Sequence, residues 1–137
     1  MTKSVSAKMG IQSGSRVLLV DAPDDAIDAI ELPDVIRETK LSNDFDYIHL
    51  FVRSQARLHE QFPKLKAHLK PTGMLWVSWP KARKDGTDLT LTKVIEIGYN
   101  YGLVESKSIS INSTWSALKF THPKDGKTYN NSFGQLP

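Results

Sequence analysis

Arg53 and Lys81 are the two basic residues whose positions indicate chemistry, because each follows a strongly apolar run. A guanidinium holds a carboxylate or phosphate through paired hydrogen bonds, and an ammonium adds a point charge. If both runs are parallel strands, their carboxyl ends meet at the sheet edge where open α/β folds bind ligands. We therefore predict a candidate anion site there. The alternative is that Arg53 pairs with Asp21 or Asp88 and ties loops together, as buried charges usually do.

Further residues at the same predicted edge complete the candidate ligand-binding set. Trp79 and Trp115 stand at junctions between strands and loops, where aromatic rings can line a pocket. Trp76 differs, because it precedes Trp79 by three positions and so points to the opposite face of a strand, which favours a place in the core. The predicted ligand-binding residues are Asp21, Arg53, Ser54, Trp79, Lys81, Asp88 and Trp115.

No residue pattern in the chain predicts a catalytic residue or a metal site. The sequence contains no cysteine, which excludes disulfides, thiolate metal ligands and cysteine nucleophiles. The four histidines lack the spacing of a metal site, and no serine stands in the glycine-flanked turn that exposes a nucleophile. We interpret His49, which lies in an apolar run, as a hydrogen-bonded interior or edge residue of a strand.

Three apolar segments predict the interior strands of a sheet. Residues 16–21 contain four consecutive apolar side chains, residues 45–52 are rich in aromatic and β-branched types, and residues 74–79 form a third run. Such runs are typical of strands that are covered on both faces. Residues 35–41 predict a weaker strand near an edge, because three of their side chains are charged.

Helical periodicity follows the second of these apolar runs. Ser54 is suited to cap a helix, and an apolar stripe with spacings of four, three and four residues continues as far as Leu69. Pro63 allows this helix to split into two pieces. Residues 70–73 are expected to stop the helix and to turn the chain into the next strand.

The remaining elements predict how the sheet is completed. Short helices are expected over residues 26–32 and from Thr90 or Thr92 to Gly102, and two final strands are expected over residues 104–111 and 115–121. A polar turn between these last strands favours a hairpin. The order of elements predicts an α/β, Rossmann-like fold with a mainly parallel sheet, a C-terminal antiparallel hairpin and helices on both faces.

This order resembles the class I S-adenosylmethionine-dependent methyltransferase fold. Residues 17–21 are similar to its first strand, residues 45–50 to its fourth strand, and residues 69–77 to a helix-to-strand passage that often reads Leu-Lys-Pro-Gly-Gly. The chain also resembles a family of uncharacterised bacterial proteins, known as a domain of unknown function, that has a truncated fold of this kind. The segments that carry this second resemblance are residues 50–54, 75–81, 87–89 and 114–120. The resemblance implies a methyltransferase-like core and no particular activity.

The resemblance fails at the loop after the first strand. Methyltransferases have a glycine-rich turn there, because the backbone must approach the cofactor closely. Residues 21–25 read Asp-Ala-Pro-Asp-Asp instead, and no glycine occurs between Gly14 and Gly73. The stretch from Asp21 to Phe45 is also too short for the two strand-and-helix units usual in methyltransferases. We therefore predict that the protein uses no cofactor.

The length of the chain, 137 residues, is that of a single domain. We predict one methyltransferase-like α/β domain over residues 1–122 and a C-terminal arm over residues 123–137, because the arm is dominated by polar residues and glycine. The apolar residues of this arm are expected to dock on the body or on a second subunit: Tyr129, Phe133 and Leu136.

Charge is distributed unevenly along the chain. Residues 21–46 hold nine acidic and two basic side chains, whereas residues 47–137 hold six acidic and thirteen basic ones, which favours an anionic partner for the later part. The leading hypothesis is a non-catalytic methyltransferase-like domain that binds a small anionic ligand or a protein partner. The alternatives are a diverged transferase and a weak nucleic-acid-binding protein, the latter disfavoured because aromatic and basic residues do not interleave. The sequence shows neither a signal peptide nor a membrane span, so a cytoplasmic location is expected.

Overall fold

Six strands form one mixed sheet in the computed structural model, which describes residues 3–129 and 133–137. The strands are β1 (Arg16–Val20), β2 (Ile36–Glu38), β3 (Phe45–Phe51), β4 (Leu69–Pro80), β5 (Val104–Ser110) and β6 (Trp115–Thr121). The helices are α1 (Val5–Met9), α2 (Asp24–Ile30), α3 (Gln55–Lys66) and α4 (Leu91–Asn100), with a 3-10 helix η1 (Lys81–Gly86) after β4. No helix in the described ranges is long and apolar enough to cross a membrane.

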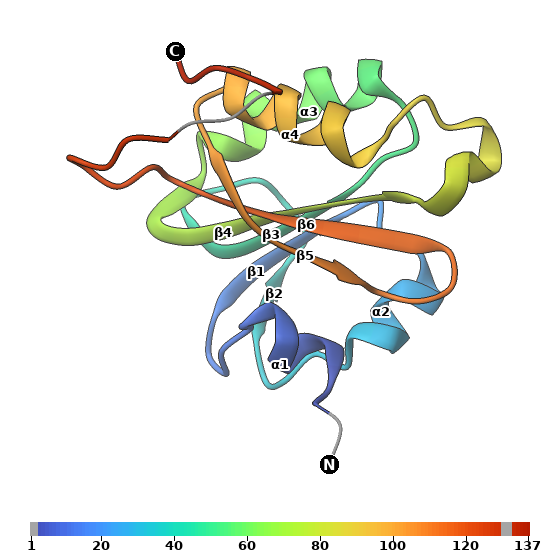
Figure 1. Ribbon diagram of the computed structural model, residues 1–137. Helices are drawn as coiled ribbons and strands as arrows, with labels where there is room; N and C mark the ends of the chain where they lie inside the picture. The colour runs from blue at the N-terminus through green and yellow to red at the C-terminus, as the bar shows by residue number, and fades with distance from the viewer. Residues whose placement is uncertain (1–2, 130–132) are drawn as a thin grey trace.

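The strand order across the sheet is β2-β1-β3-β4-β6-β5. β1 pairs in parallel with β2 and β3, and β3 pairs in parallel with β4. β6 runs antiparallel to both β4 and β5, so that a C-terminal hairpin completes the sheet (Figure 1). The structure therefore confirms the predicted α/β, Rossmann-like fold with a mainly parallel sheet and a terminal antiparallel hairpin.

Helices cover both faces of the sheet, with α1 and α2 on one face and α3 and α4 on the other (Figure 1). Side chains along each strand alternate between the two faces. Trp76 belongs to the core cluster that α1 and α2 cover, and Trp79 belongs to the cluster that α3 and α4 cover. The predicted opposite orientation of these two tryptophans, and the core position of Trp76, are thereby confirmed.

The passage from α3 to β4 differs from the prediction. α3 ends at Lys66 and β4 begins at Leu69, so residues 70–73 belong to the strand and do not form a turn. Leu69 pairs with Phe45, and a Cβ atom at Gly73 would lie 2.9 Å from the Phe45 carbonyl oxygen. Gly73 is therefore needed for the close approach of β4 to β3, which is a tertiary contact that local turn signals do not reveal.

Pro63 lies inside α3 without splitting it. Because proline has no amide hydrogen, the carbonyl four residues earlier, at His59, loses its helical donor. The Tyr101 hydroxyl donates to this His59 carbonyl at 3.4 Å and also lies 2.9 Å from His59 Nδ1. Tyr101 thus supplies a substitute donor, and the helix continues through the position at which the sequence allowed it to split.

The end of the chain docks on its own body, against α4 and the adjoining core. The Gln135 amide donates to Asn100 Oδ1 at 3.2 Å. Of the three apolar residues expected to dock, Tyr129 and Leu136 pack against the cluster that α3 and α4 cover, whereas Phe133 is 46% exposed. The predicted division of the chain at residue 122 stays a prediction.

Three polar side chains form a hydrogen-bonded chain inside the protein. Tyr47 Oη lies 2.5 Å from His49 Nδ1, and His49 Nε2 lies 2.7 Å from Ser78 Oγ. All three residues are completely buried, and the His49 ring stacks on Phe51 with 4.3 Å between ring centres. Burial lowers the pKa of His49 to about 3, so the imidazole is neutral at neutral pH. The structure thus makes His49 a hydrogen-bonded interior residue.

α4 packs closely on β6 because Gly98 has no side chain. A Cβ atom at this position would lie 2.0 Å from Phe120 Cε1. Phe120 is itself completely buried and meets the Phe62 ring edge-on, with 5.4 Å between ring centres. A glycine inside a helix costs about 1 kcal/mol relative to alanine, so this contact opposes the local helix preference.

We expect Gly98→Ala to destabilise the protein by about 1–3 kcal/mol, because the added methyl group must displace the Phe120 ring in a packed core. Urea unfolding followed by circular dichroism measures the change. In a protein that already carries Phe120→Leu, adding Gly98→Ala is expected to reduce stability by less than it does in the wild type, since the shorter side chain leaves room for the methyl group. A Gly98→Ala protein at least as stable as the wild type would contradict the tight contact.

The buried neutral His49 predicts a specific dependence of stability on pH. Its pKa is about 3 in the folded state and 6.5 as the ordinary value, so between these limits the unfolded chain binds a proton that the folded chain does not. The free energy of unfolding therefore falls by about 1.4 kcal/mol for each unit by which the pH decreases through this window. In His49→Gln this contribution is expected to be absent, so the free energy of unfolding should change less steeply with pH between about pH 3 and 6.5 than it does in the wild type. His59→Gln, at an exposed position, is the matched control and should retain it; equal slopes in His49→Gln and wild type would refute the assignment.

Candidate functional site

The carboxyl ends of β1, β3 and β4 meet at one edge of the sheet, because these strands are parallel. The guanidinium carbon of Arg53, which follows β3, lies 5.0 Å from the centre of the Trp115 ring. Pro80, the last residue of β4, pairs with Trp115, and the Lys81 amide donates to the Thr114 carbonyl at 2.8 Å. Arg53, Lys81 and Trp115 therefore share this edge, which is the geometry that the strand order predicts.

The two tryptophans of the predicted set lie on opposite faces of this edge. Trp115 meets the Phe51 ring at 85°, with 5.2 Å between ring centres, in the cluster that α1 and α2 cover. Trp79 lies in the cluster that α3 and α4 cover. The predicted residues are therefore divided between the two faces and are not gathered around a single pocket.

A cavity of about 350 Å³ opens at this edge, and we refer to it as the carboxyl-edge cavity. Two of the predicted residues, Trp79 and Lys81, contribute to its wall, and the Lys81 ammonium donates to Ser110 Oγ. An indole and aliphatic walls beside one cation suit a small anion that carries an apolar part. The complete lining is Trp79, Pro80, Lys81, Ala82, Leu89, Thr90, Leu91 and Ser116.

Asp21 is engaged by a residue other than the expected one. It follows β1 directly and has a left-handed backbone conformation, φ 57°, and its carboxylate pairs with Arg57 at 3.0 Å. Arg57 also pairs with Glu60 at 3.0 Å. The hydrogen bond to Asp21 is the main cause that raises the pKa of Arg57. Asp21 therefore ties the loop after β1 to α3, as the loop-tying alternative anticipates, but through Arg57.

Ser54 and Asp88 stabilise the start of α3. Ser54 Oγ accepts the Arg57 amide at 3.1 Å, which is the N-cap that the sequence predicts. Asp88 Oδ1 accepts the Gln55 amide at 2.8 Å, and the Gln55 side chain donates to the Asp88 carbonyl at 2.8 Å. These contacts join the loop after η1 to α3 and hold the two loops of the carboxyl edge in place.

The loop between β1 and α2 does not fit a nucleotide cofactor. α2 carries Asp24 and Asp25 in its first turn, and Asn112 donates to Asp25 at 3.2 Å. Carboxylates at a helix N-terminus repel a phosphate group, and Pro23 has no amide hydrogen to offer it. The glycine backbone that permits close approach in methyltransferases is absent from residues 21–25.

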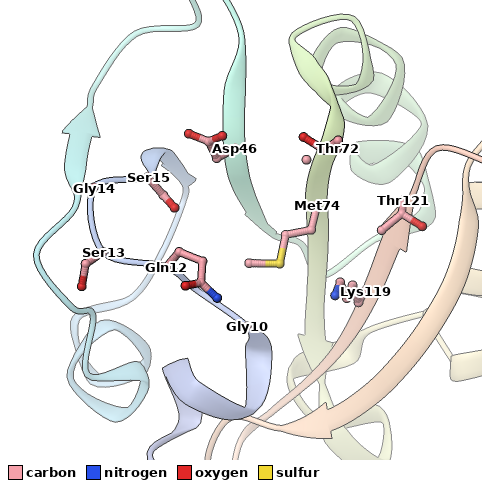
Figure 2. A pocket seen from close by; sticks show the side chains of 11 residues that line it. Gly10, Gln12, Ser13, Gly14, Ser15, Asp46, Thr72, Met74, Lys119 and Thr121 are labelled. Atoms are coloured by element: carbon pink, nitrogen blue, oxygen red, sulfur yellow. The ribbon is translucent and has the colours of Figure 1, made fainter.

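A second cavity, of about 430 Å³, lies at the opposite edge of the sheet, and we refer to it as the amino-edge pocket. Figure 2 shows that its lining comes from four places: the loop between α1 and β1, the start of β3, the early part of β4, and the end of β6. The sequence did not predict this pocket. The signal for it is Lys119, a charged residue at an inward-facing position of the last strand, two residues after the buried Ala117.

Asp46 lines the amino-edge pocket and is held by two donors. Its Oδ2 accepts the Arg16 amide at 2.8 Å, and its Oδ1 accepts the Lys70 ammonium at 3.1 Å. Partial burial acts to raise the pKa of Asp46, but these hydrogen bonds outweigh it and the pKa is lowered. The carboxylate is therefore ionised and paired with a cation of this chain.

The buried chain of Ser78, His49 and Tyr47 has residue types found in nucleophilic sites, but its position excludes that role. Its three members are completely buried and do not line the two cavities described above. A reacting hydroxyl must reach its substrate, which Ser78 does not. Within residues 3–129 and 133–137, no group of three histidine or acidic side chains is arranged to hold a metal ion.

Several solved structures of methyltransferases are similar to this chain. Ribosomal protein L11 methylase from Lactobacillus delbrueckii subsp. bulgaricus has a TM-score of 0.57 and 15% identity, over 88% of this chain and 76% of that chain. Precorrin-6y C5,15-methyltransferase from Geobacter metallireducens has a TM-score of 0.60 and 11% identity, over 87% of this chain and 86% of that chain. Burkholderia thailandensis 1,6-didemethyltoxoflavin-N1-methyltransferase, solved with S-adenosylhomocysteine, has a TM-score of 0.59 and 11% identity, over 88% of this chain and 77% of that chain.

No protein-family model matches the chain, and no curated protein sequence matches it. At identities of 15% and below, the similar structures establish the fold alone. The protein therefore has a methyltransferase-like Rossmann fold.

Proposed function

We propose that this protein is a non-catalytic methyltransferase-like domain that binds a small anionic ligand at the carboxyl edge of its sheet. The observation that carries the proposal is the presence of Lys81 and Trp79 in the wall of the carboxyl-edge cavity. The fold supports this location, because open α/β sheets bind ligands beyond the carboxyl ends of their strands.

Lys81 brings a positive charge that the protein itself does not neutralise. Within the part of the chain that the structure describes, its ammonium has the Ser110 hydroxyl as hydrogen-bond partner and no carboxylate at ion-pair distance. Trp79 and Leu89 provide apolar walls beside it. A cation next to apolar walls favours a carboxylate with a compact apolar body, such as an aromatic acid.

Arg53 adds a second positive charge to the same edge. Its guanidinium lies over Trp115 and is not part of the cavity wall. Trp115 helps to hold this guanidinium in place through a cation–π contact.

Benzoate is the probe for the carboxyl-edge cavity, and benzyl alcohol is its uncharged counterpart. We expect benzoate to shift the Trp79 indole N–H resonance in a saturable manner in ¹H–¹⁵N NMR spectra, and benzyl alcohol to bind at least about ten-fold more weakly. Lys81→Met is expected to weaken benzoate binding about ten-fold or more, because a hydrogen bond to a charged group contributes about 1.5–3 kcal/mol.

Lys119→Met, which removes an equal charge at the opposite edge, is the matched control and should leave benzoate binding unchanged. Equal affinity for benzoate and benzyl alcohol would refute the role of charge at this edge. Unchanged benzoate affinity in a folded Lys81→Met protein would remove Lys81 from the site.

S-adenosylmethionine and NAD are expected not to bind, because the acidic loop over residues 21–25 replaces the glycine-rich turn. Isothermal titration calorimetry checks this, with a methyltransferase known to bind S-adenosylmethionine as positive control in the same buffer. A dissociation constant below about 100 μM, equivalent to roughly 5.5 kcal/mol, would instead support a diverged transferase.

A further inference from the structure

Lys119 is a half-buried cation without a counter-charge in the wall of the amino-edge pocket. It lies on the inner face of β6, in line with Trp115 and Ala117 of the core cluster that α1 and α2 cover. Its ammonium makes no hydrogen bond or ion pair with any residue in the described ranges. Because an ammonium that is partly removed from water needs an acceptor, a bound anion would complete this arrangement.

A second lysine stands directly opposite Lys119. Lys107 on β5 is its cross-strand partner. Residues opposite each other in an antiparallel pair point to the same face of the sheet, with Cβ atoms about 5 Å apart. Two side chains of like charge in such positions repel each other. Lys107 donates to the Lys8 carbonyl at 2.6 Å, and a carbonyl carries no formal charge. The lysine pair therefore leaves a positive potential on this side of the pocket.

Asp46, the acidic residue in the pocket wall, does not cancel this potential. Its two oxygens already accept the Arg16 amide and the Lys70 ammonium. Lys70 balances the charge of Asp46, so the Lys119 charge remains uncompensated by the protein.

Polar groups of the loop between α1 and β1 form the other wall. Gln12 and Ser15 point their amide and hydroxyl groups toward the β4 and β6 side of the pocket, whereas the Ser13 hydroxyl points away from it (Figure 2). The backbone amides of Gln12 and Ser13 donate to no acceptor within the described residues. The Gln12 side-chain amide and the Ser15 hydroxyl can both donate hydrogen bonds to a ligand hydroxyl group and accept them from it, and the backbone amides can donate to it.

We propose that the amino-edge pocket binds a small hydroxylated anion, a carboxylate or a phosphate monoester, with the anionic group beside Lys119 and the hydroxyl groups beside Gln12 and Ser15. Met74 forms the apolar floor between these two walls. The pocket lies at the edge opposite the carboxyl-edge cavity, so the two sites are independent of each other.

Glycerate, glycerol 3-phosphate and glycerol are the probes, and the ¹³C-methyl resonance of Met74 is the readout. We expect saturable shifts with at least one of the two anions and much weaker shifts with glycerol. Comparison of the two anions distinguishes a carboxylate ligand from a phosphate ligand. No shift with either anion, or shifts of equal affinity with glycerol, would overturn the proposal.

Variants of Lys119 test the charge. Lys119→Met is expected to weaken binding of the preferred anion about ten-fold or more, Lys119→Arg to change it by less than about three-fold, and Lys81→Met to leave it unchanged. A folded Lys119→Met protein with wild-type affinity would overturn the proposal.

Gln12→Ala provides a second test, because Gln12 is exposed and its replacement leaves the core intact. This variant is expected to bind the hydroxylated anion several-fold more weakly than the wild type and to bind inorganic phosphate with unchanged affinity. Equal effects on both ligands, or no effect on the hydroxylated anion, would exclude the assigned hydroxyl contacts.

Discussion

The burial of β3 on both faces is the constraint on which the rest of the structure depends. Its side chains are shared between two faces: Tyr47 and Phe51 lie under α1 and α2, and Phe45, Ile48 and Leu50 lie under α3 and α4. A strand covered twice requires helices on both sides of the sheet, which crossover connections between parallel strands supply. The polar His49 is compatible with this interior because Tyr47 and Ser78 occupy both of its ring nitrogens. Parallel pairing also makes the two edges of the sheet chemically different.

The carboxyl edge is held together by its own charged groups. Asp21 binds Arg57, and Asp88 binds the first turn of α3, so these carboxylates fix loops and are not available to a ligand. Lys81 differs, because its partner is a hydroxyl. At the amino edge the same distinction separates Asp46, which is paired with Lys70, from Lys119. Whether a charge is balanced within the protein therefore separates the groups that hold loops from those that suit a ligand.

The sequence predicted the strands whose apolar content is continuous, and it predicted the shared edge of Arg53, Lys81 and Trp115 from strand order alone. The failures have a common physical cause, namely contacts between distant segments. Pro63 does not split α3 because Tyr101 replaces the lost donor, and residues 70–73 join β4 because Gly73 lets this strand approach Phe45 closely. The short elements α1 and η1 have too few residues for periodicity to appear. The division of the predicted site between two faces was also hidden, because strand order fixes an edge but not the direction of each side chain.

Asp21 shows how the fold is retained without a glycine-rich loop. Its left-handed backbone, φ 57°, is a conformation that glycine adopts without strain and that aspartate tolerates better than most residues. A tight change of direction after β1 is therefore compatible with this residue. The carboxylate is held toward α3 by Arg57 rather than toward a ligand. In this protein the turn after β1 consequently serves to position α3, and the positive charge that remains for a ligand lies farther along the edge, at Lys81.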